Sequence, residues 1–206
     1  ASPDYCFRVL THNKSQSSSM IADHRNNYEE PKYGGTAGIN ASYSFRKYFS
    51  VEMGINYMNR GYKTKEYADF IASMPNDPLI PETLEYVNNY HCIYTPVIFN
   101  YIAGAKKLRF IVGIGVAPVM LVARKITQTT VYMDGNTTVT KYTSEMGYNK
   151  LNLGGKFNAG IDLVLSPKLN LKIQPVLRFD SGIFQTNPIK EHLWSAGVIT
   201  GLFFLI

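Results

Sequence analysis

Residues 33–45 read YGGTAGINASYSF, a stretch in which aromatic and aliphatic side chains alternate with glycine and small polar ones. A β-strand sends successive side chains to opposite faces, so this alternation predicts a strand with one apolar face and one small, polar face. Tyr33, Ile39 and Tyr43 lie on the apolar face, and Asn40 and Ser42 lie on the other. Which of the two faces meets water decides the class of protein.

The same two-residue period recurs along the chain. It is found at residues 5–11, 49–60, 89–101, 108–122, 151–165, 169–179 and 192–205. We therefore predict one domain over residues 1–206, an all-β, eight-stranded antiparallel up-and-down barrel. Tight turns alternate with longer loops, which are expected near residues 13–32, 61–88, 123–149 and 181–191. An Asp-Gly pair at 134–135 predicts a small hairpin extension in the third of these loops.

The composition excludes several classes of protein. A hydrophobic fraction of 45%, an aromatic fraction of 13% and a charged fraction of 17% suit a folded, strand-rich chain and not a disordered one. The net charge of +6 comes from scattered lysines and arginines, which form no stripe that would follow a nucleic-acid backbone. Cys6 and Cys92 fit neither a metal-ligand spacing nor a disulfide framework. The sequence also contains no run of about eighteen apolar residues that would cross a membrane as a helix.

Three features favour a barrel that spans a membrane with its apolar face against lipid. Glycines such as Gly38, Gly54 and Gly113 crowd the other face, which suits a narrow lumen better than a solvated exterior. A strand of 13 residues such as 33–45, tilted by about 45°, spans roughly 30 Å, the thickness of the hydrocarbon layer. The apolar faces also end in aromatic side chains, as expected at membrane interfaces. The predicted interface residues are Tyr33, Tyr43, Phe45, Phe49, Tyr57, Trp194 and Phe204. The alternative is a soluble lipocalin-like barrel that binds a small apolar ligand.

In the membrane barrel, the polar faces of the strands fill the lumen. The predicted lumen network is Glu52, Arg60, Arg109, Lys156, Asp162, Lys172 and Arg178, with Arg8 and Asp180 as further candidates. An eight-stranded interior is just wide enough for side chains, so a plugged lumen is predicted and not a conducting pore. Bases outnumber acids in this set, and water or an anion would have to balance the excess.

The strand count also predicts how the chain is oriented. With an even number of strands, both termini lie on the short-turn side, which is periplasmic in outer-membrane barrels, and the long loops are extracellular. The chain opens at Ala1 without an initiator methionine, as expected after removal of a signal peptide.

The sequence contains no recognisable set of catalytic residues. Glu191 and His192 are neighbours that point to opposite faces of a strand, and the glycines at 113–115 lack the third glycine of a dinucleotide motif. We predict a non-enzymatic protein without cofactor or metal, which acts through its loops. The second long loop is unusually apolar and is the candidate docking surface. Its residues are Tyr62, Tyr67, Phe70, Ile71, Leu79, Ile80 and Leu84.

Three segments resemble the PorT-like outer-membrane β-barrel domain family of Gram-negative bacteria. They are the glycine-spaced strand and turn at 33–60, YTPVIFNYIAGAKKLRFIVGIGVAPVM at 94–120, and LNLGGKFNAGIDLVLSPKLNLKIQPVLRFDSGI at 151–183. The chain departs from the family at Tyr94, where relatives often carry an acidic residue, and at its end, which is not aromatic.

The resemblance implies eight strands, a signal peptide and insertion into the outer membrane, and a few relatives act in secretion or gliding machinery. On this basis we expect a scaffold or a subunit of a larger envelope or secretion complex. Its expected partners are outer-membrane lipid, lipopolysaccharide and other outer-membrane proteins, and no nucleic acid.

Overall fold

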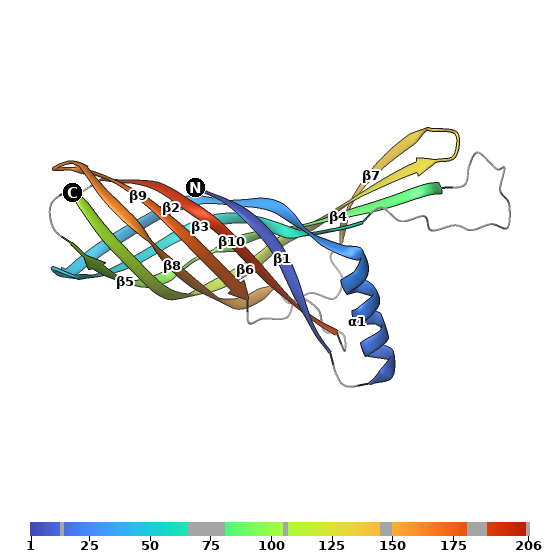
Figure 1. Ribbon diagram of the computed structural model, residues 1–206, viewed down its shortest axis with the longest axis horizontal. Helices are drawn as coiled ribbons and strands as arrows, with labels where there is room; N and C mark the ends of the chain where they lie inside the picture. The colour runs from blue at the N-terminus through green and yellow to red at the C-terminus, as the bar shows by residue number, and fades with distance from the viewer. Residues whose placement is uncertain (13–14, 66–80, 105–106, 145–149, 181–188, 205–206) are drawn as a thin grey trace.

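The computed structural model describes residues 1–12, 15–65, 81–104, 107–144, 150–180 and 189–204. In these residues the chain forms ten strands and one helix (Figure 1). They are β1 (Ser2–His12), α1 (Gln16–Tyr28), β2 (Glu29–Arg46), β3 (Phe49–Thr64), β4 (Pro81–Tyr94), β5 (Val97–Ala103), β6 (Leu108–Tyr132), β7 (Thr137–Ser144), β8 (Leu151–Ser166), β9 (Leu169–Asp180) and β10 (Ile189–Phe204).

The strands close into a ring. Neighbouring strands of the ring pair antiparallel, and β1 lies between β2 and β10. β4 and β5 share one position, because both pair with β3 and with β6. They are separated at residues 95–96, where Pro96 has no N–H to donate and Thr95 donates instead to the Pro118 carbonyl at 3.1 Å. Counting β4 and β5 as one strand and leaving out β7, which pairs only with β6, the described residues confirm the predicted eight-stranded antiparallel meander.

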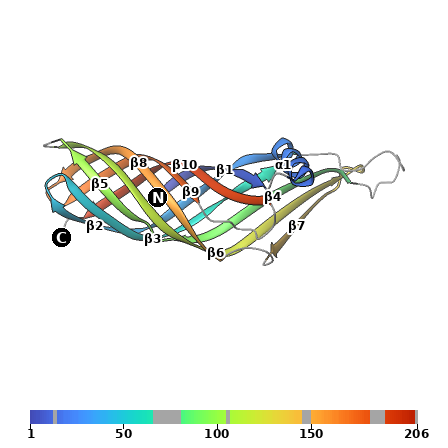
Figure 2. The same ribbon diagram turned by 90° about the horizontal axis from the view of Figure 1, so that it is seen from below.

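The two ends of the barrel differ. The β2–β3 and β8–β9 turns, the end of β5, the start of β6 and the end of β10 lie at one end, which we call the short-turn end (Figure 1). α1 and the β6–β7 hairpin lie at the opposite end, and β4, β6 and β7 continue past the ring as a projecting ribbon (Figures 1 and 2). Gly135 has a φ of +81° in the turn of this hairpin, so the predicted Asp-Gly hairpin extension is present.

Several segments predicted as loops carry regular structure instead. The loop at 13–32 contains α1, whose first turn is capped by the Ser15 side chain, which accepts from the Ser18 N–H at 3.4 Å. β3 continues to Thr64 and β4 begins at Pro81, inside the predicted loop 61–88. The predicted loop 123–149 holds the end of β6 and all of β7, where β-branched threonines favour extended backbone. β10 begins at Ile189, inside the predicted loop 181–191, and 181–188 lie outside the described residues.

The apolar faces of the strands point outward. On β2, Ile39 is 85% exposed and Tyr33 is 81% exposed, whereas Thr36 on the opposite parity is buried. The backbone of β3 lies so close to Gly38 on the inner face that only glycine fits there, because a Cβ on Gly38 would lie 2.3 Å from the Ile55 carbonyl oxygen. The buried apolar cluster lies inside the half of the barrel nearer α1. It comprises Met58, Tyr62, Tyr90, Cys92, Tyr94, Ala117, Val119 and Leu193. None of the helical residues described here is part of a helix long and apolar enough to cross a bilayer.

Candidate functional site

Within the described residues, four ion pairs lie in the lumen, two of which join β3 to β9 on the opposite side of the barrel, while the other two join adjacent or next-nearest strands. Lys172 donates to Glu52 at 3.1 Å, and Arg178 donates to Asp4 at 2.7 Å. Arg109 donates to Asp162 at 2.5 Å, and Arg60 pairs with Asp180. Apart from Arg109, these side chains are all almost completely buried. All seven residues of the predicted lumen network point inward, and Glu52–Lys172 and Arg109–Asp162 are pairs within that set.

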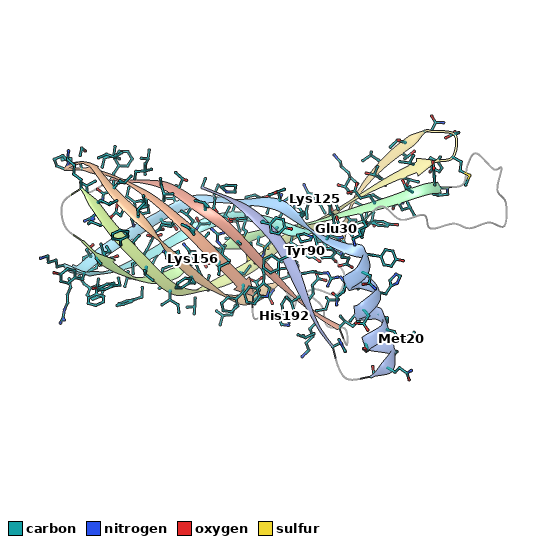
Figure 3. All side chains as sticks on the ribbon, in the orientation of Figure 1. Met20, Glu30, Tyr90, Lys125, Lys156 and His192 are labelled. Atoms are coloured by element: carbon teal, nitrogen blue, oxygen red, sulfur yellow. The ribbon has the colours of Figure 1, made fainter. Side chains whose placement is uncertain are left out.

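Lys156 differs from the other six. Its side chain points into the lumen from β8 and the residue is 5% exposed, but it makes no hydrogen bond or ion pair with any residue that the structure describes. Its direct neighbour across the β8–β9 ladder is Arg178, on the same face. Like charges directly opposite each other are unfavourable, and only Arg178 has a carboxylate partner, Asp4. Figure 3 shows Lys156 within the barrel, farther from α1 than Tyr90.

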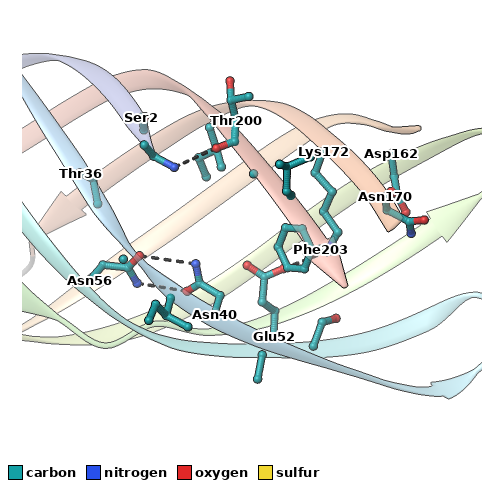
Figure 4. A pocket seen from close by; sticks show the side chains of 18 of the residues that line it. Ser2, Thr36, Asn40, Glu52, Asn56, Asp162, Asn170, Lys172, Thr200 and Phe203 are labelled. Atoms are coloured by element: carbon teal, nitrogen blue, oxygen red, sulfur yellow. Dashed lines mark hydrogen bonds and ion pairs between the residues drawn. The ribbon is translucent and has the colours of Figure 1, made fainter. Parts of the chain in front are cut away.

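A cavity of about 980 Å³ occupies the lumen toward the short-turn end. Its wall combines polar and apolar side chains, with Glu52, Lys172 and Phe203 gathered on one side and the hydrogen-bonded Asn40 and Asn56 on another (Figure 4). The Lys172 ammonium lies 3.7 Å from the centre of the Phe203 ring. The cavity is therefore large enough for a small organic molecule and bordered by charged groups.

Buried charged and aromatic side chains cluster in the other half of the lumen. Arg60 and Asp180 are each 1 to 2% exposed there, beside the aromatic rings of Tyr90 and Tyr94. The Tyr90 hydroxyl donates to Glu191 at 2.8 Å, which links this cluster to the mouth of the barrel.

α1 covers that mouth through Arg25. The Arg25 guanidinium donates to Glu29 at 2.6 Å, to the Tyr62 hydroxyl at 2.9 Å and to Glu191 at 3.1 Å. Arg8 pairs with Glu29 from β1 and lies 5.3 Å from the centre of the Tyr62 ring. Burial opposes the charge on Arg25, but the hydrogen bond to Glu29 and the charge of Glu191 outweigh it. The pKa of Arg25 is therefore raised and the group stays charged.

The prediction of a docking loop was wrong for two of its residues. Tyr62 is 4% exposed on the inner face of β3, beneath Arg25, and Leu84 is 7% exposed on β4. β3 and β4 are longer than predicted, so both side chains belong to strands: Tyr62 lies beneath Arg25 at the mouth of the lumen, and Leu84 lies on the projecting ribbon opposite Thr130. The other candidates, Tyr67, Phe70, Ile71, Leu79 and Ile80, lie outside the described residues.

The seven predicted interface aromatics all point away from the lumen. Tyr33, Tyr43, Phe45, Tyr57 and Phe204 are between 45 and 81% exposed. Phe49 and Trp194 are half-buried because they pack on neighbouring rings, Phe49 on Phe99 at 5.5 Å and Trp194 on Phe179 at 5.2 Å.

Glu191 and His192 point to opposite faces of β10. Glu191 is buried against Tyr90 and Arg25, whereas His192 contacts the Thr11 hydroxyl at 3.0 Å. Over the part of the chain that the structure describes, no group of three His, Cys, Asp or Glu side chains is placed to hold a metal ion.

Comparison with known proteins identifies the family. The model of the outer membrane protein beta-barrel domain family matches residues 10–187. The chain belongs to this family. It is thus a protein of the outer membrane of Gram-negative bacteria, where its exposed apolar belt faces lipid, and the lipocalin-like alternative is not favoured. No curated relative matches the chain significantly.

Two solved structures are similar to this outer-membrane barrel. Neisserial surface protein A is 11% identical, with 99% of this chain and 95% of that chain covered and a TM-score of 0.41. Ail, the attachment invasion locus protein of Yersinia pestis, solved with the heparin analogue sucrose octasulfate, is 9% identical, with 98% and 95% covered and a TM-score of 0.35.

Sequence reasoning missed two parts of the site. Asp4 was not predicted, although it shares the inward parity of Cys6 and Arg8 on β1, and that parity would have found it. The contacts of Arg25 were also missed, because residues 13–32 show no apolar period that would indicate a helix.

Proposed function

We propose that this outer-membrane barrel is a non-enzymatic, PorT-like scaffold or subunit of a larger envelope or secretion complex. In this proposal, a signal peptide directs its export and both termini face the periplasm. The end of the barrel that carries α1 and the projecting ribbon is then extracellular, and the ribbon contacts another outer-membrane protein.

The main observation behind this proposal is the exposed surface of the projecting ribbon. Residues from Thr137 to Thr143 of β7 are all exposed, among them Val139 at 56% and Tyr142 at 43%. β7 pairs on one side with β6, and its other edge pairs with no strand among the described residues. An exposed strand edge offers a row of backbone N–H and C=O groups to a strand of a partner protein.

The buried side chains in the half of the lumen nearer α1 support a scaffold over a pore. The Arg60–Asp180 pair lies beneath Tyr90, Glu191 and Arg25, which together cross the lumen below α1. Because these charged groups are mutually paired and almost fully buried, we do not expect solutes to pass along the axis through that half.

Site-specific photo-crosslinking in native membranes tests the proposal. A photoreactive phenylalanine analogue at Val139 is expected to give a discrete, larger product that contains a second envelope protein. The same analogue at Ile39, an equally apolar position on the lipid-facing wall, is the matched control and is expected to give no such product. Recovery of the barrel alone from both positions, or the same products from both, would contradict a docking role for the ribbon.

A further inference from the structure

The charges buried in the lumen do not balance. Among the residues that the structure describes, four carboxylates are buried in the barrel below the mouth, and each has a separate cationic partner. These pairs are Asp4–Arg178, Glu52–Lys172, Asp162–Arg109 and Asp180–Arg60. Lys156 is the fifth cation of this region; Glu52 and Asp4 attract it from a distance, but each of them is ion-paired with another cation and neither forms an ion pair with Lys156. A buried charge is costly unless it is paired, so one negative charge is needed near Lys156.

Further hydrogen-bond donors border the same cavity. Lys156 from β8, Arg178 from β9 and Tyr94 from β4 all line it, and each of these residues is at most 5% exposed. The Arg178 Nε and the Tyr94 hydroxyl have no hydrogen-bond partner within the described residues. Buried polar groups in folded proteins are almost always hydrogen-bonded, so three groups that can donate lie at one cavity without an acceptor.

The chemistry of these groups selects the ligand. A carboxylate carries one negative charge and only accepts hydrogen bonds, so it matches both the charge of Lys156 and the donors around it. The cavity of about 980 Å³ is much larger than a carboxylate group alone, and Ile102, Ile199 and Phe203 supply apolar surface to its wall. We propose that the lumen cavity binds a small organic monocarboxylate, with its carboxylate at Lys156, Tyr94 and Arg178 and its apolar part beside Phe203. This binding site is independent of the docking role of the ribbon.

Ligand-observed fluorine NMR on the purified full chain in detergent tests the site, with 4-fluorobenzoate as the probe. Wild-type protein is expected to broaden the fluorine signal in a saturable manner. Lys156→Met is expected to weaken binding at least about tenfold, because a hydrogen bond to a charged group is lost together with the charge. Lys168→Met removes the same charge from the exposed β8–β9 turn and is expected to bind as the wild type does.

Two further measurements separate binding from folding and from nonspecific association. Tyr94→Phe keeps the ring and removes the hydroxyl, and it is expected to weaken binding by about threefold to tenfold while the heat-modifiable band on gels stays unchanged. The neutral 4-fluorobenzamide has nearly the same shape and is expected to show no saturable binding. The proposal is overturned if wild type shows no saturable binding, if folded Lys156→Met binds as tightly as Lys168→Met, or if the amide or inorganic phosphate competes as well as the carboxylate.

Discussion

The Arg60–Asp180 ion pair is predicted to be the most sensitive single contact of the barrel interior. Asp180→Asn keeps the shape of the side chain but leaves the Arg60 charge uncompensated, at a site where both side chains are 1% exposed. Removing one partner of a buried pair costs about 3–5 kcal/mol, which lowers the folding equilibrium constant by roughly two to four powers of ten. Changing both partners to apolar residues, in Arg60→Met with Asp180→Leu, is expected to recover most of this loss, because no charge then remains buried.

Urea unfolding of the barrel in phospholipid vesicles measures this free energy, with gel mobility of unboiled samples as the check on folding. Glu30→Gln is the matched control, because it breaks the pair between Glu30 on β2 and Lys63 on β3, the strand that also carries Arg60. Those two side chains are 38% and 41% exposed and 3.7 Å apart, so the expected loss is only about 0–1 kcal/mol. If Asp180→Asn and Glu30→Gln destabilise the barrel equally, the buried pair does not stabilise the lumen as argued.

Three other perturbations test the wall, the interior and the mouth of the barrel. Ile39→Arg places a charge on a side chain that is 85% exposed to lipid, and it is expected to cost about 2–4 kcal/mol in the same vesicle assay; a neutral effect would contradict lipid contact. Gly38→Ala is expected to abolish the heat-modifiable band, since its Cβ would lie 2.3 Å from the Ile55 carbonyl oxygen, whereas Gly35→Ala, whose Cβ would meet only the Ser2 carbonyl oxygen at 3.4 Å, keeps it; equal yields of folded protein would refute this. Arg25→Met removes four hydrogen bonds to Glu29, Tyr62 and Glu191 beneath α1, so amide exchange is expected to quicken in α1 and not in the barrel strands; unchanged protection of α1 would count against this anchor.

Much of the barrel could be predicted from local periodicity. The alternation in residues 33–45 identified a strand and its two faces, and the glycines on one face indicated a narrow interior. The odd or even position of a residue along each strand predicted which charged side chains point inward and placed Glu191 and His192 on opposite faces. In extended backbone, successive side chains point to opposite faces.

The alternation of apolar and polar residues did not predict the strand ends, because some strands continue beyond their apolar stretches. Tyr62 was assigned to a loop, but β3 extends to Thr64 and its inner face is covered by α1. The length of these strands depends on pairing with β4 and on the packing of α1, and neither contact leaves a period in the sequence.

The sequence by itself determined the eight-stranded architecture, the lipid-facing and lumen-facing parities, and the excess of positive charge inside. Only the tertiary structure decided which charges pair, since the partners come from distant strands, as in Asp4 and Arg178, which are 174 residues apart. The relative register of the strands around the ring sets which inward side chains lie at the same height. That register places Lys156 opposite Arg178, without a carboxylate ion-pair partner. Both residues line a cavity whose wall is built from several strands.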